Sequence, residues 1–271
     1  MTFFKRILDF YIGASLHIAL AVLTLVLMTQ HMFGITGRIA MPLFAFFATV
    51  TGYNFVKYHT IAFSRTEKLS WQLRAVIAVS ALASAGAVFF FLKLGIMAQA
   101  ATAIFGVLTI LYALPFFPNR KNARNWAGVK IYIVALCWAG VTVVLPLLDA
   151  GIELTCDFYL KCVQRFILVF VLILIFEIVD LDKDDPLLQT VPQQIGQQRT
   201  KILGIALLVV FFLLELLRTQ TQWAQLWANL VLVIVTAVML LFAAPIRSRY
   251  YSAFWAESIP IIWYFMMIAS K

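Results

Sequence analysis

The stretch FEIVDLDKDDPLLQTVPQQIG, residues 176–196, determines how the rest of the sequence is interpreted. It begins at the end of a long apolar segment and places five carboxylates and one lysine within nine residues. Charged groups are costly in the hydrocarbon part of a bilayer, and they mark functional sites where they occur near it. The stretch therefore predicts a polar site where a membrane-spanning segment reaches water.

The sequence on both sides of this stretch is predominantly apolar. Of the 271 residues, 63% are hydrophobic and 12% are charged, whereas about a quarter of the residues in soluble domains are charged. Segments of roughly 17–25 apolar residues can cross a bilayer, and a backbone in lipid must satisfy its own hydrogen bonds by forming helices. We therefore expect an all-α integral membrane protein with a single transmembrane domain, residues 1–271. Its nine predicted transmembrane helices are 10–30, 39–56, 72–92, 95–114, 130–148, 160–179, 201–218, 225–245 and 251–269.

The lysines and arginines are distributed unevenly among the predicted loops. With the N-terminus in the cytoplasm, 15 of the 21 fall on the cytoplasmic side. The positive-inside rule then predicts an N-in, C-out protein. We expect it in the bacterial inner membrane, with the acidic stretch facing the cytoplasm. The net charge of +9 is explained by this topology, so no nucleic-acid partner is expected.

Three acids of the stretch share a spacing that suggests a common role. Glu177, Asp180 and Asp184 lie at i, i+3 and i+7, which would place them on one face of a continuous helix. Three carboxylates on one face repel each other and need a positive partner where water is scarce. Mg²⁺ is one candidate, because it commonly bridges carboxylates to the phosphates of a substrate. The alternative is a solvated helix end with Lys183 as the local partner.

The run E-I-V-D-x-x-x-D at 177–184, followed by TVPQQIG at 190–196, resembles the second aspartate-rich motif of the UbiA superfamily of intramembrane prenyltransferases. In that family D-x-x-D-x-x-x-D precedes T-L-P-x-x-x-G, and Glu177 stands where the first aspartate often lies. The segment LYALPFFPNRKNARNW, residues 111–126, is similar to the family's Y-x-x-P and basic stretch after helix four. GVKIYIVALCWAGVTVVLP, from residue 128, looks like its fifth helix. The resemblance covers most of the chain and implies a UbiA-like helical bundle.

The chain departs from the family at the first aspartate-rich motif, N-D-x-x-D-x-x-x-D. The matching segment, residues 54–62, reads NFVKYHTIA. Asn54 matches, but Phe55, Tyr58 and Ala62 stand at the aspartate positions, and Lys57 makes the segment basic. Half of the metal ligands that the family would supply are therefore missing.

The resemblance implies transfer of a polyprenyl group from its diphosphate to a lipophilic, aromatic acceptor within the membrane. In the family, metal ions neutralise the diphosphate and make it a better leaving group. Carried over to this chain, the metal ligands for Mg²⁺ are Glu177, Asp180 and Asp184, and the catalytic residues are Asp180, Asp184 and Lys57. The residues assigned to the diphosphate are Asn54, Arg65, Tyr112, Lys121 and Arg124.

The missing acids leave two alternatives to this enzyme. Lys57 or Arg65 can pair with Asp180 or Asp184 and close the site, which would give a catalytically inactive homologue that binds isoprenoid lipid or a membrane partner. A small membrane transporter with an acidic gate on the cytoplasmic side is the second alternative, although acids on several facing helices are scarce here.

Glu257 is a separate candidate, because an ionisable residue within a membrane segment is a functional candidate by default. Pairing with Arg247 or Arg249 at the membrane interface is the alternative.

Overall fold

The computed structural model describes residues 3–62, 70–113, 128–219 and 223–269, and all regular structure in these ranges is helical. The α-helices are α1 (Phe3–Gly13), α2 (Leu16–Met32), α3 (Ala40–Ala62), α4 (Trp71–Phe91), α5 (Ile96–Ala113), α6 (Val129–Ala139), α7 (Leu145–Ala150), α8 (Cys156–Val179), α9 (Val191–Ile195), α10 (Gln197–Glu215), α11 (Trp223–Leu241) and α12 (Glu257–Ala269). Two π-helical turns, η3 (Gly140–Val144) and η5 (Tyr251–Ala256), and a 3₁₀ turn, η4 (Pro186–Leu188), complete the described elements.

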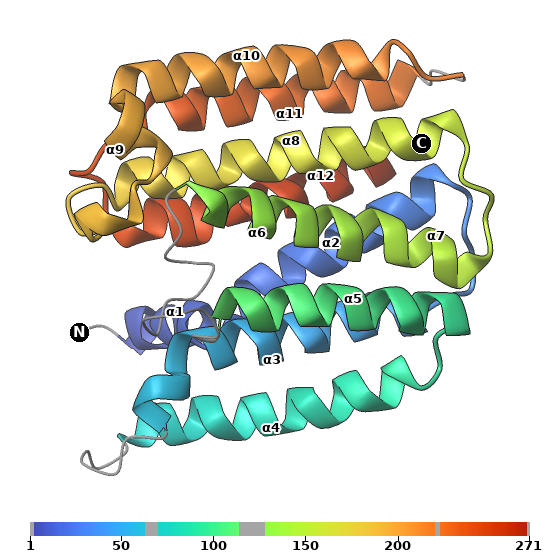
Figure 1. Cartoon of the computed structure of the whole chain (residues 1–271), viewed down its shortest axis with the longest axis horizontal. Coiled ribbons are helices and arrows are strands. Elements are labelled where there is room, and N and C mark those ends of the chain that lie inside the picture. Colours follow the sequence, from blue (N-terminus) through green and yellow to red (C-terminus); the bar gives the residue numbers. More distant parts are fainter. Residues whose placement is uncertain (1–2, 63–69, 114–127, 220–222, 270–271) are drawn as a thin grey trace.

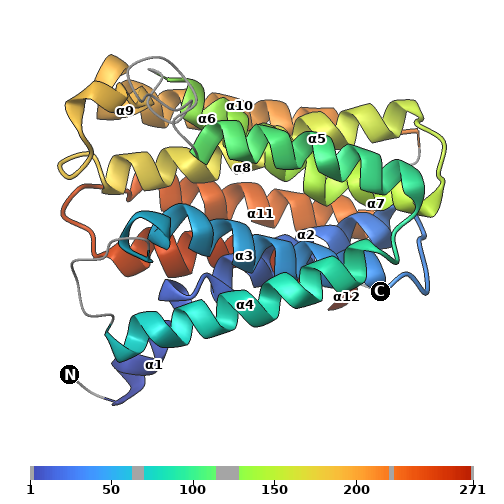
Figure 2. The same ribbon diagram turned by 60° about the horizontal axis from the view of Figure 1, so that its bottom comes forward.

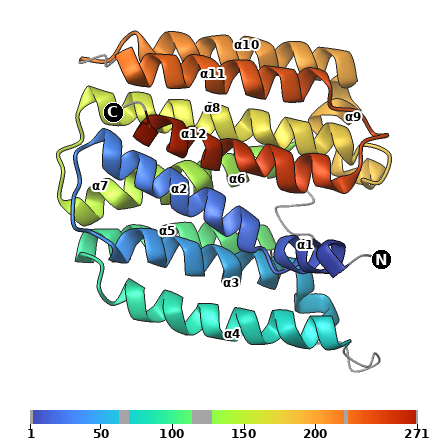
Figure 3. The ribbon, with the colours of Figure 1, turned by 180° about the vertical axis from the view of Figure 1, so that it is seen from behind.

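The long helices lie side by side in a bundle (Figure 1). Helix α8 lies in the middle and packs against α6, α10 and α11, whereas α4 lies at the edge opposite to the α10–α11 pair. From behind, α2 and α12 are seen on the near face (Figure 3), where they pack on each other and α2 also packs on α3. Helix α8 is thus the central element of the bundle.

Burial follows the same arrangement. In the apolar segment of α8 that is long enough to span a membrane, 72% of the residues are buried, against 11% in the corresponding segment of α4. Leu168 and Leu174 of α8 are fully enclosed, whereas Leu82 of α4 is 75% exposed. An apolar outer surface suits lipid, since lipid tails are as apolar as leucine. The chain is an integral membrane protein whose outer helices present such a surface.

Six helices in the described ranges are long and apolar enough to cross a membrane, or seven if the bent pair α1–α2 is one span. Helices α3 and α5 occupy two further predicted segments. The all-helical membrane fold is therefore confirmed. The count of nine spans and the N-in, C-out orientation stay predictions.

The predicted helix 10–30 is interrupted, because α1 and α2 meet at an angle of 57°. Ser15, at the junction, has a left-handed backbone conformation with φ of 59°. Figure 2 shows α1 bent away from the bundle at its N-terminal end. A sharp bend leaves backbone carbonyls without helical partners, so other elements must supply the donors.

A buried ionic cluster lies at the end of α8 farthest from the acidic stretch. The Glu215 side chain is fully buried and accepts hydrogen bonds from Lys161 Nζ at 2.5 Å, Gln164 Nε2 at 3.0 Å, Gln225 Nε2 at 2.8 Å and Arg218 Nη1 at 3.3 Å. A buried carboxylate is tolerated when its oxygens are this well paired. Because the donors come from α8, α11 and the turn after α10, the cluster fixes these elements relative to one another.

A glycine contact joins α5 to the π-helical turn η3. A Cβ atom on Gly140 would lie 2.1 Å from the Phe105 ring, closer than any real contact. Only glycine therefore allows the aromatic ring of α5 to pack against the backbone of η3. This contact sets the separation between α5 and the α6–α7 span.

Candidate functional site

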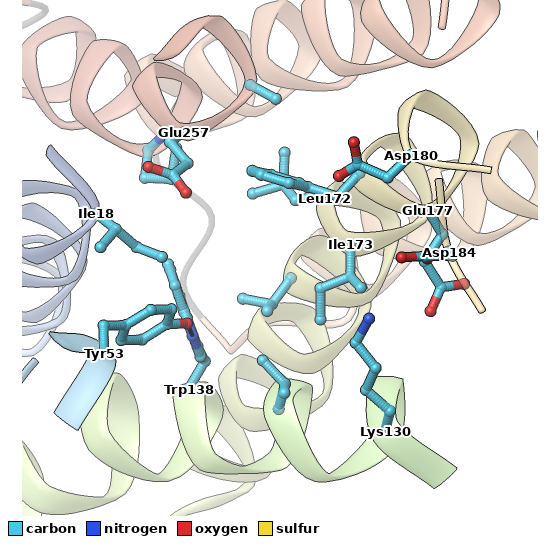
Figure 4. A pocket seen from close by; sticks show the side chains of 15 residues that line it. Ile18, Tyr53, Lys130, Trp138, Leu172, Ile173, Glu177, Asp180, Asp184 and Glu257 are labelled. Carbon is cyan, nitrogen blue, oxygen red and sulfur yellow. Dashed lines mark hydrogen bonds between the residues drawn. The ribbon is translucent and has the colours of Figure 1, made fainter. Parts of the chain in front are cut away.

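A cavity of about 240 Å³ lies between the central helices at the end of α8. Its wall is formed by side chains from α2, α3, α6, α8, the turn after α8, η5 and α12 (Figure 4). The lining residues are Ile18, Tyr53, Lys130, Val134, Trp138, Val169, Leu172, Ile173, Phe176, Glu177, Asp180, Asp184, Ala256, Glu257 and Pro260. The three acids predicted from the sequence thus line one cavity, although they do not share a helix.

The helix that carries these acids is shorter than the spacing argument requires. Helix α8 ends at Val179, Asp180 is its C-cap, and Asp184 lies in the following turn. The prediction that the three acids occupy one face of a continuous helix is therefore wrong. The turn instead closes by hydrogen bonds from the backbone N–H groups of Lys183 and Asp184 to the carbonyl of Asp180, at 2.8 and 2.9 Å. This turn brings Asp184 back toward the cavity.

Glu177 is the most buried of the three acids predicted from the sequence. Its side chain is 3% exposed, and its Oε2 atom accepts a hydrogen bond from the backbone N–H of Val191 at 3.1 Å. Val191 is the first residue of α9, where the backbone N–H of Thr190 donates a hydrogen bond of 2.9 Å to Gln193 Oε1. The first turn of a helix offers unpaired N–H groups that favour a negative charge. The sequence after the acids therefore folds into a short helix that fixes the Glu177 carboxylate.

A lysine that the sequence analysis did not assign to the site faces this carboxylate. Lys130, in the first turn of α6, and Asp184 are the charged residues that interact electrostatically with Glu177. In Figure 4 the amine of Lys130 points from α6 toward the Glu177–Asp184 pair at the same end of the cavity. Among the described residues, one ammonium group therefore faces two carboxylates at this end of the cavity.

Asp180 has a partner of its own. Its Oδ1 atom pairs with Lys183 Nζ at 3.2 Å, with both side chains substantially exposed. Figure 4 shows the Asp180 carboxylate apart from those of Glu177 and Asp184. In the described ranges no group of three or more His, Cys, Asp or Glu side chains is arranged to hold a metal ion. The predicted three-carboxylate face is thus replaced by a pair, Glu177 and Asp184, with Asp180 beside it.

This donor set fits Mg²⁺ in one specific way. The ion keeps several waters and usually takes only one or two carboxylates, with phosphate oxygens of a substrate completing its octahedral shell. The pair Glu177 and Asp184 meets that requirement. It does not make an all-protein site, so a metal ion would bind here together with a phosphate.

The rest of the cavity is apolar and aromatic. Leu172 and Ile173 of α8 form part of its wall between the acidic end and Glu257 (Figure 4). Trp138 Nε1 donates a hydrogen bond of 2.8 Å to Tyr53 Oη, which joins α6 to α3 at the wall. Buried tryptophan and tyrosine side chains combine apolar area with a polar group that needs a partner. The cavity therefore has a charged end and a largely apolar interior.

The segment of α3 that matches the family's first motif makes a different set of contacts. Tyr58 Oη donates to the carbonyl of Gly13 at 3.0 Å, Asn54 Nδ2 donates to that of Ala14 at 3.1 Å, and Lys57 Nζ donates to Ser15 Oγ at 3.0 Å. These three bonds satisfy the polar groups at the α1–α2 bend. We refer to Asn54, Lys57 and Tyr58 as the α3 clamp.

The α3 clamp separates two predicted site residues from the acids of α8. Asn54 is 3% exposed and also donates to Ser80 Oγ at 2.9 Å. The carboxylate that interacts electrostatically with Lys57 is Glu257, not Asp180 or Asp184. The structure thus brings Glu177, Asp180 and Asp184 together at one cavity. Asn54 and Lys57 are instead hydrogen-bonded to residues of the α1–α2 bend. The structure does not pair Lys57 with these acids, and Arg65 lies outside the described residues. The pair of Asp180 with Lys183 is the local partner expected for a solvated helix end.

The remaining predicted residues lie outside the described parts. Arg65, Lys121 and Arg124 fall in segments 63–69 and 114–127, and the Tyr112 side chain is likewise not described. Their assignment to diphosphate stays a prediction. The sequence analysis missed Lys130, Tyr53 and Trp138. Lys130 is the first charge after the basic stretch in the segment that resembles the family's fifth helix, and this position is the signal that could have identified it.

Comparisons with known proteins give a consistent result for the fold. No family model matches the chain, and no curated protein matches its sequence. Among solved structures, a UbiA homologue from Archaeoglobus fulgidus bound to Cd²⁺ is similar with a TM-score of 0.60 and 12% identity, covering 97% of this chain and 98% of that one. A structure described for digeranylgeranylglyceryl phosphate synthase is similar with a TM-score of 0.58 and 11% identity, covering 98% and 97%.

A second structure of the Archaeoglobus fulgidus UbiA homologue gives a TM-score of 0.57 at 13% identity, with 95% of each chain covered. These likenesses extend along nearly the whole of both chains, although few residues are identical. The resemblance to the UbiA superfamily that the acidic stretch suggested is thereby confirmed at the level of the fold: this chain is a UbiA-like helical bundle.

Proposed function

We propose that this protein is a prenyltransferase that moves a polyprenyl group from its diphosphate to a lipophilic acceptor within the membrane. The observation that carries the proposal is the cavity, in which two carboxylates and Lys130 at one end adjoin a largely apolar interior. A polyprenyl diphosphate has the matching shape and polarity, with a highly charged head and an apolar tail. The UbiA-like fold supports the same class of substrate.

Two of the similar structures support the chemistry. One concerns digeranylgeranylglyceryl phosphate synthase, and another contains Cd²⁺. For this chain we propose Mg²⁺ as the divalent ion, held by Glu177 and Asp184 with Asp180 nearby. When bound, the ion would neutralise the diphosphate and make it a better leaving group.

The residues of the chain would contribute as follows. Lys130 would offset phosphate charge at the acidic end, and the Val191 N–H would keep the Glu177 carboxylate in place. The apolar wall at Leu172 and Ile173 would exclude water from the allylic carbon. The aromatic pair of Tyr53 and Trp138 would face the positive charge that develops there, because aromatic rings attract cations.

Basic residues outside the described ranges complete the proposal. Arg65, Lys121 and Arg124, with Tyr112, would bind the diphosphate from the loops that follow α3 and α5. The acceptor is proposed to be aromatic, and the protein to lie in the bacterial inner membrane with the acidic stretch facing the cytoplasm. Lys57 would act only indirectly, through Glu257 and the α3 clamp.

The test is the thermal stability of the whole chain in detergent with geranylgeranyl diphosphate, with and without Mg²⁺. A ligand at 100 times its Kd stabilises the folded state by about 2.7 kcal/mol. We expect Mg²⁺-dependent stabilisation that is lost in Asp184→Asn and Glu177→Gln. Asp182→Asn is the matched control, because Asp182 is exposed and does not line the cavity. Stabilisation indifferent to both Mg²⁺ and Asp184 would contradict the proposal.

Two observations favour a second candidate, a non-catalytic protein that binds an isoprenoid diphosphate. Asp180 is paired with Lys183, and the described residues include no metal cluster of three acidic, histidine or cysteine side chains. This candidate predicts the same stabilisation with and without Mg²⁺ and no release of diphosphate on long incubation with lipophilic acceptors.

A further inference from the structure

Outside the cavity, two basic side chains lie close to each other where α11 ends beside the start of α10. Lys201 is in the second turn of α10, and Arg247 is in the connection between α11 and η5. Arg247 is the charged residue that interacts electrostatically with Lys201. In Figure 1 the two helices form one edge of the bundle, and α9 leads into α10 at this end. Two like charges at short range repel each other, so a feature of the structure must hold them there.

Both cations are held by carbonyl groups at the C-terminus of α11. Lys201 Nζ donates to the carbonyl of Leu241 at 2.7 Å. Arg247 Nε donates to the carbonyl of Phe242 at 3.0 Å, and the guanidinium carbon lies 5.4 Å from the centre of the Tyr251 ring. Carbonyls at the end of a helix have no partner within that helix, and cations are favourable there. The two charged groups are therefore fixed in position without any ligand.

These contacts use only part of the hydrogen-bonding capacity of the two side chains. Each donates one N–H, whereas a lysine amine has three donors and an arginine guanidinium has five. Among the described residues no carboxylate forms an ion pair with Lys201 or Arg247, and the pairing of Arg247 with Glu257 that the sequence allowed is not formed. Arg249, two residues further on, does have such a partner, Asp9 of α1. Lys201 and Arg247 thus offer two positive charges and several donors to an anion.

The surroundings of the pair specify the kind of anion. Ile246, beside Arg247, is 93% exposed, and Ile202 and Phe242 are exposed as well. Basic groups next to exposed apolar side chains suit the boundary between water and lipid, where lysine and arginine attract anionic lipids. A soluble anion would leave the apolar side chains unused. A phospholipid matches both features, because its phosphate accepts hydrogen bonds from arginine and lysine and its acyl chains are apolar.

We propose that Lys201 and Arg247 form a binding site for the headgroup phosphate of an anionic membrane phospholipid, whose acyl chains lie along the exposed apolar side chains of α10 and α11. The bound phosphate bridges α10 to the connection between α11 and η5. Neither residue lines the cavity, so the inference does not depend on the proposed function. The lipid is a resident of this surface and takes no part in prenyl transfer.

The experiment measures lipid binding to the whole chain in detergent by native mass spectrometry. Dioleoylphosphatidylglycerol is compared with dioleoylphosphatidylcholine, which has the same acyl chains and a phosphate but no net charge. We expect the wild-type protein to bind the anionic lipid about tenfold more tightly, because each basic residue near a lipid surface adds to the attraction. Lys201→Gln combined with Arg247→Gln should bring the ratio of the two Kd values close to one. Lys201→Arg combined with Arg247→Lys should keep the ratio, since both charges remain.

A matched control removes two positive charges at the same end of the bundle. Arg74→Gln combined with Arg199→Gln changes exposed residues in the first turns of α4 and α10 and should leave the ratio as in the wild type. An equal loss in this control overturns the inference, because the preference would then reflect overall charge. If the Lys201–Arg247 glutamine variant shows no melting transition, Arg247→Gln alone decides, because it leaves the bond from Lys201 to Leu241 in place. An unchanged ratio in that variant overturns the inference.

Two further arms identify the source of the phosphate. An excess of inorganic pyrophosphate should not displace the anionic lipid, and complete displacement would overturn the lipid assignment in favour of a soluble anion. Stabilisation by geranylgeranyl diphosphate with Mg²⁺ should be the same in the Lys201–Arg247 glutamine variant as in the wild type. Its loss there would overturn the inference, because the two residues would then bind the proposed substrate. A lipid preference that depends on Lys201 and Arg247 without any diphosphate effect in the wild type would support the inference and contradict the proposed function.

Discussion

Glu177 and Val191 are joined by a hydrogen bond of 3.1 Å between a side-chain carboxylate of α8 and the first backbone N–H of α9. The acid and the helix that fixes it come from the two halves of one short stretch of sequence. This hydrogen bond therefore links the last turn of α8 directly to the first turn of α9.

Lys130→Met should weaken the binding of geranylgeranyl diphosphate. Lys130 is the described cation that interacts electrostatically with Glu177. If its amine donates to a phosphate oxygen of the ligand, that charged hydrogen bond contributes about 1.5–3 kcal/mol. The expected loss is roughly 10- to 100-fold in Kd, measured by titration in detergent. Lys130→Arg should retain most of the affinity. Lys93→Met is the control, because Lys93 does not line the cavity, and an equal effect of both lysine-to-methionine variants would contradict the role of Lys130.

Asn54→Ala should destabilise the fold without a direct effect on the cavity. The substitution removes the donor to Ala14 at a buried site and leaves that carbonyl without this partner, which costs about 1–3 kcal/mol. The free energy of unfolding in mixed detergent micelles provides the measurement. Ala substitution of Phe55, the exposed neighbour on α3, should cost less. A variant as stable as the wild type would show that the α3 clamp does not hold the bend.

Glu215→Ala should be among the most destabilising single substitutions. It leaves Lys161, which is 5% exposed, as an unpaired buried charge, and breaking such a pair costs about 3–5 kcal/mol. The double variant Glu215→Leu with Lys161→Met should recover much of the lost stability, because both charges are then removed. Unfolding experiments on the three proteins test this. A double variant that is less stable than Glu215→Ala would contradict the argument.

Gly140→Ala should destabilise the protein by about 1–3 kcal/mol, as overpacking of a close contact does. The new Cβ would overlap the Phe105 ring. Gly106→Ala is the matched control on α5, since a Cβ there meets nothing within 4 Å, and alanine favours the helix by about 0.5–1 kcal/mol. Phe105→Leu combined with Gly140→Ala should restore part of the stability. Melting temperatures of the four proteins decide the outcome.

The helical membrane fold could be predicted from the sequence, because apolar segments of spanning length leave the backbone few options. The acidic end of the cavity could also be predicted, since Glu177 and Asp184 stand out in an apolar chain. Their geometry could not: the helix ends at Val179, and the spacing argument assumed that it continues. Periodicity identifies a face only as long as the helix lasts.

Other parts of the site depend on contacts between distant segments. Lys130 is far from Glu177 in the sequence, and only the packing of α6 on α8 brings them to one cavity. Lys57 looks like a phosphate ligand in the sequence, yet it is bound to Ser15 because the α1–α2 bend needs donors. That bend follows from a left-handed residue that no periodicity reveals.

The α3 clamp limits which residues position 58 can accept. Tyr58 holds the carbonyl of Gly13 and also occupies a position where the resembling family carries an aspartate. An aspartate at position 58 has no hydroxyl to donate, so an acid there would leave the Gly13 carbonyl without this donor and weaken the bend. A metal ligand introduced at this position would therefore cost stability. Position 58 can serve the bend or a metal ion, but not both.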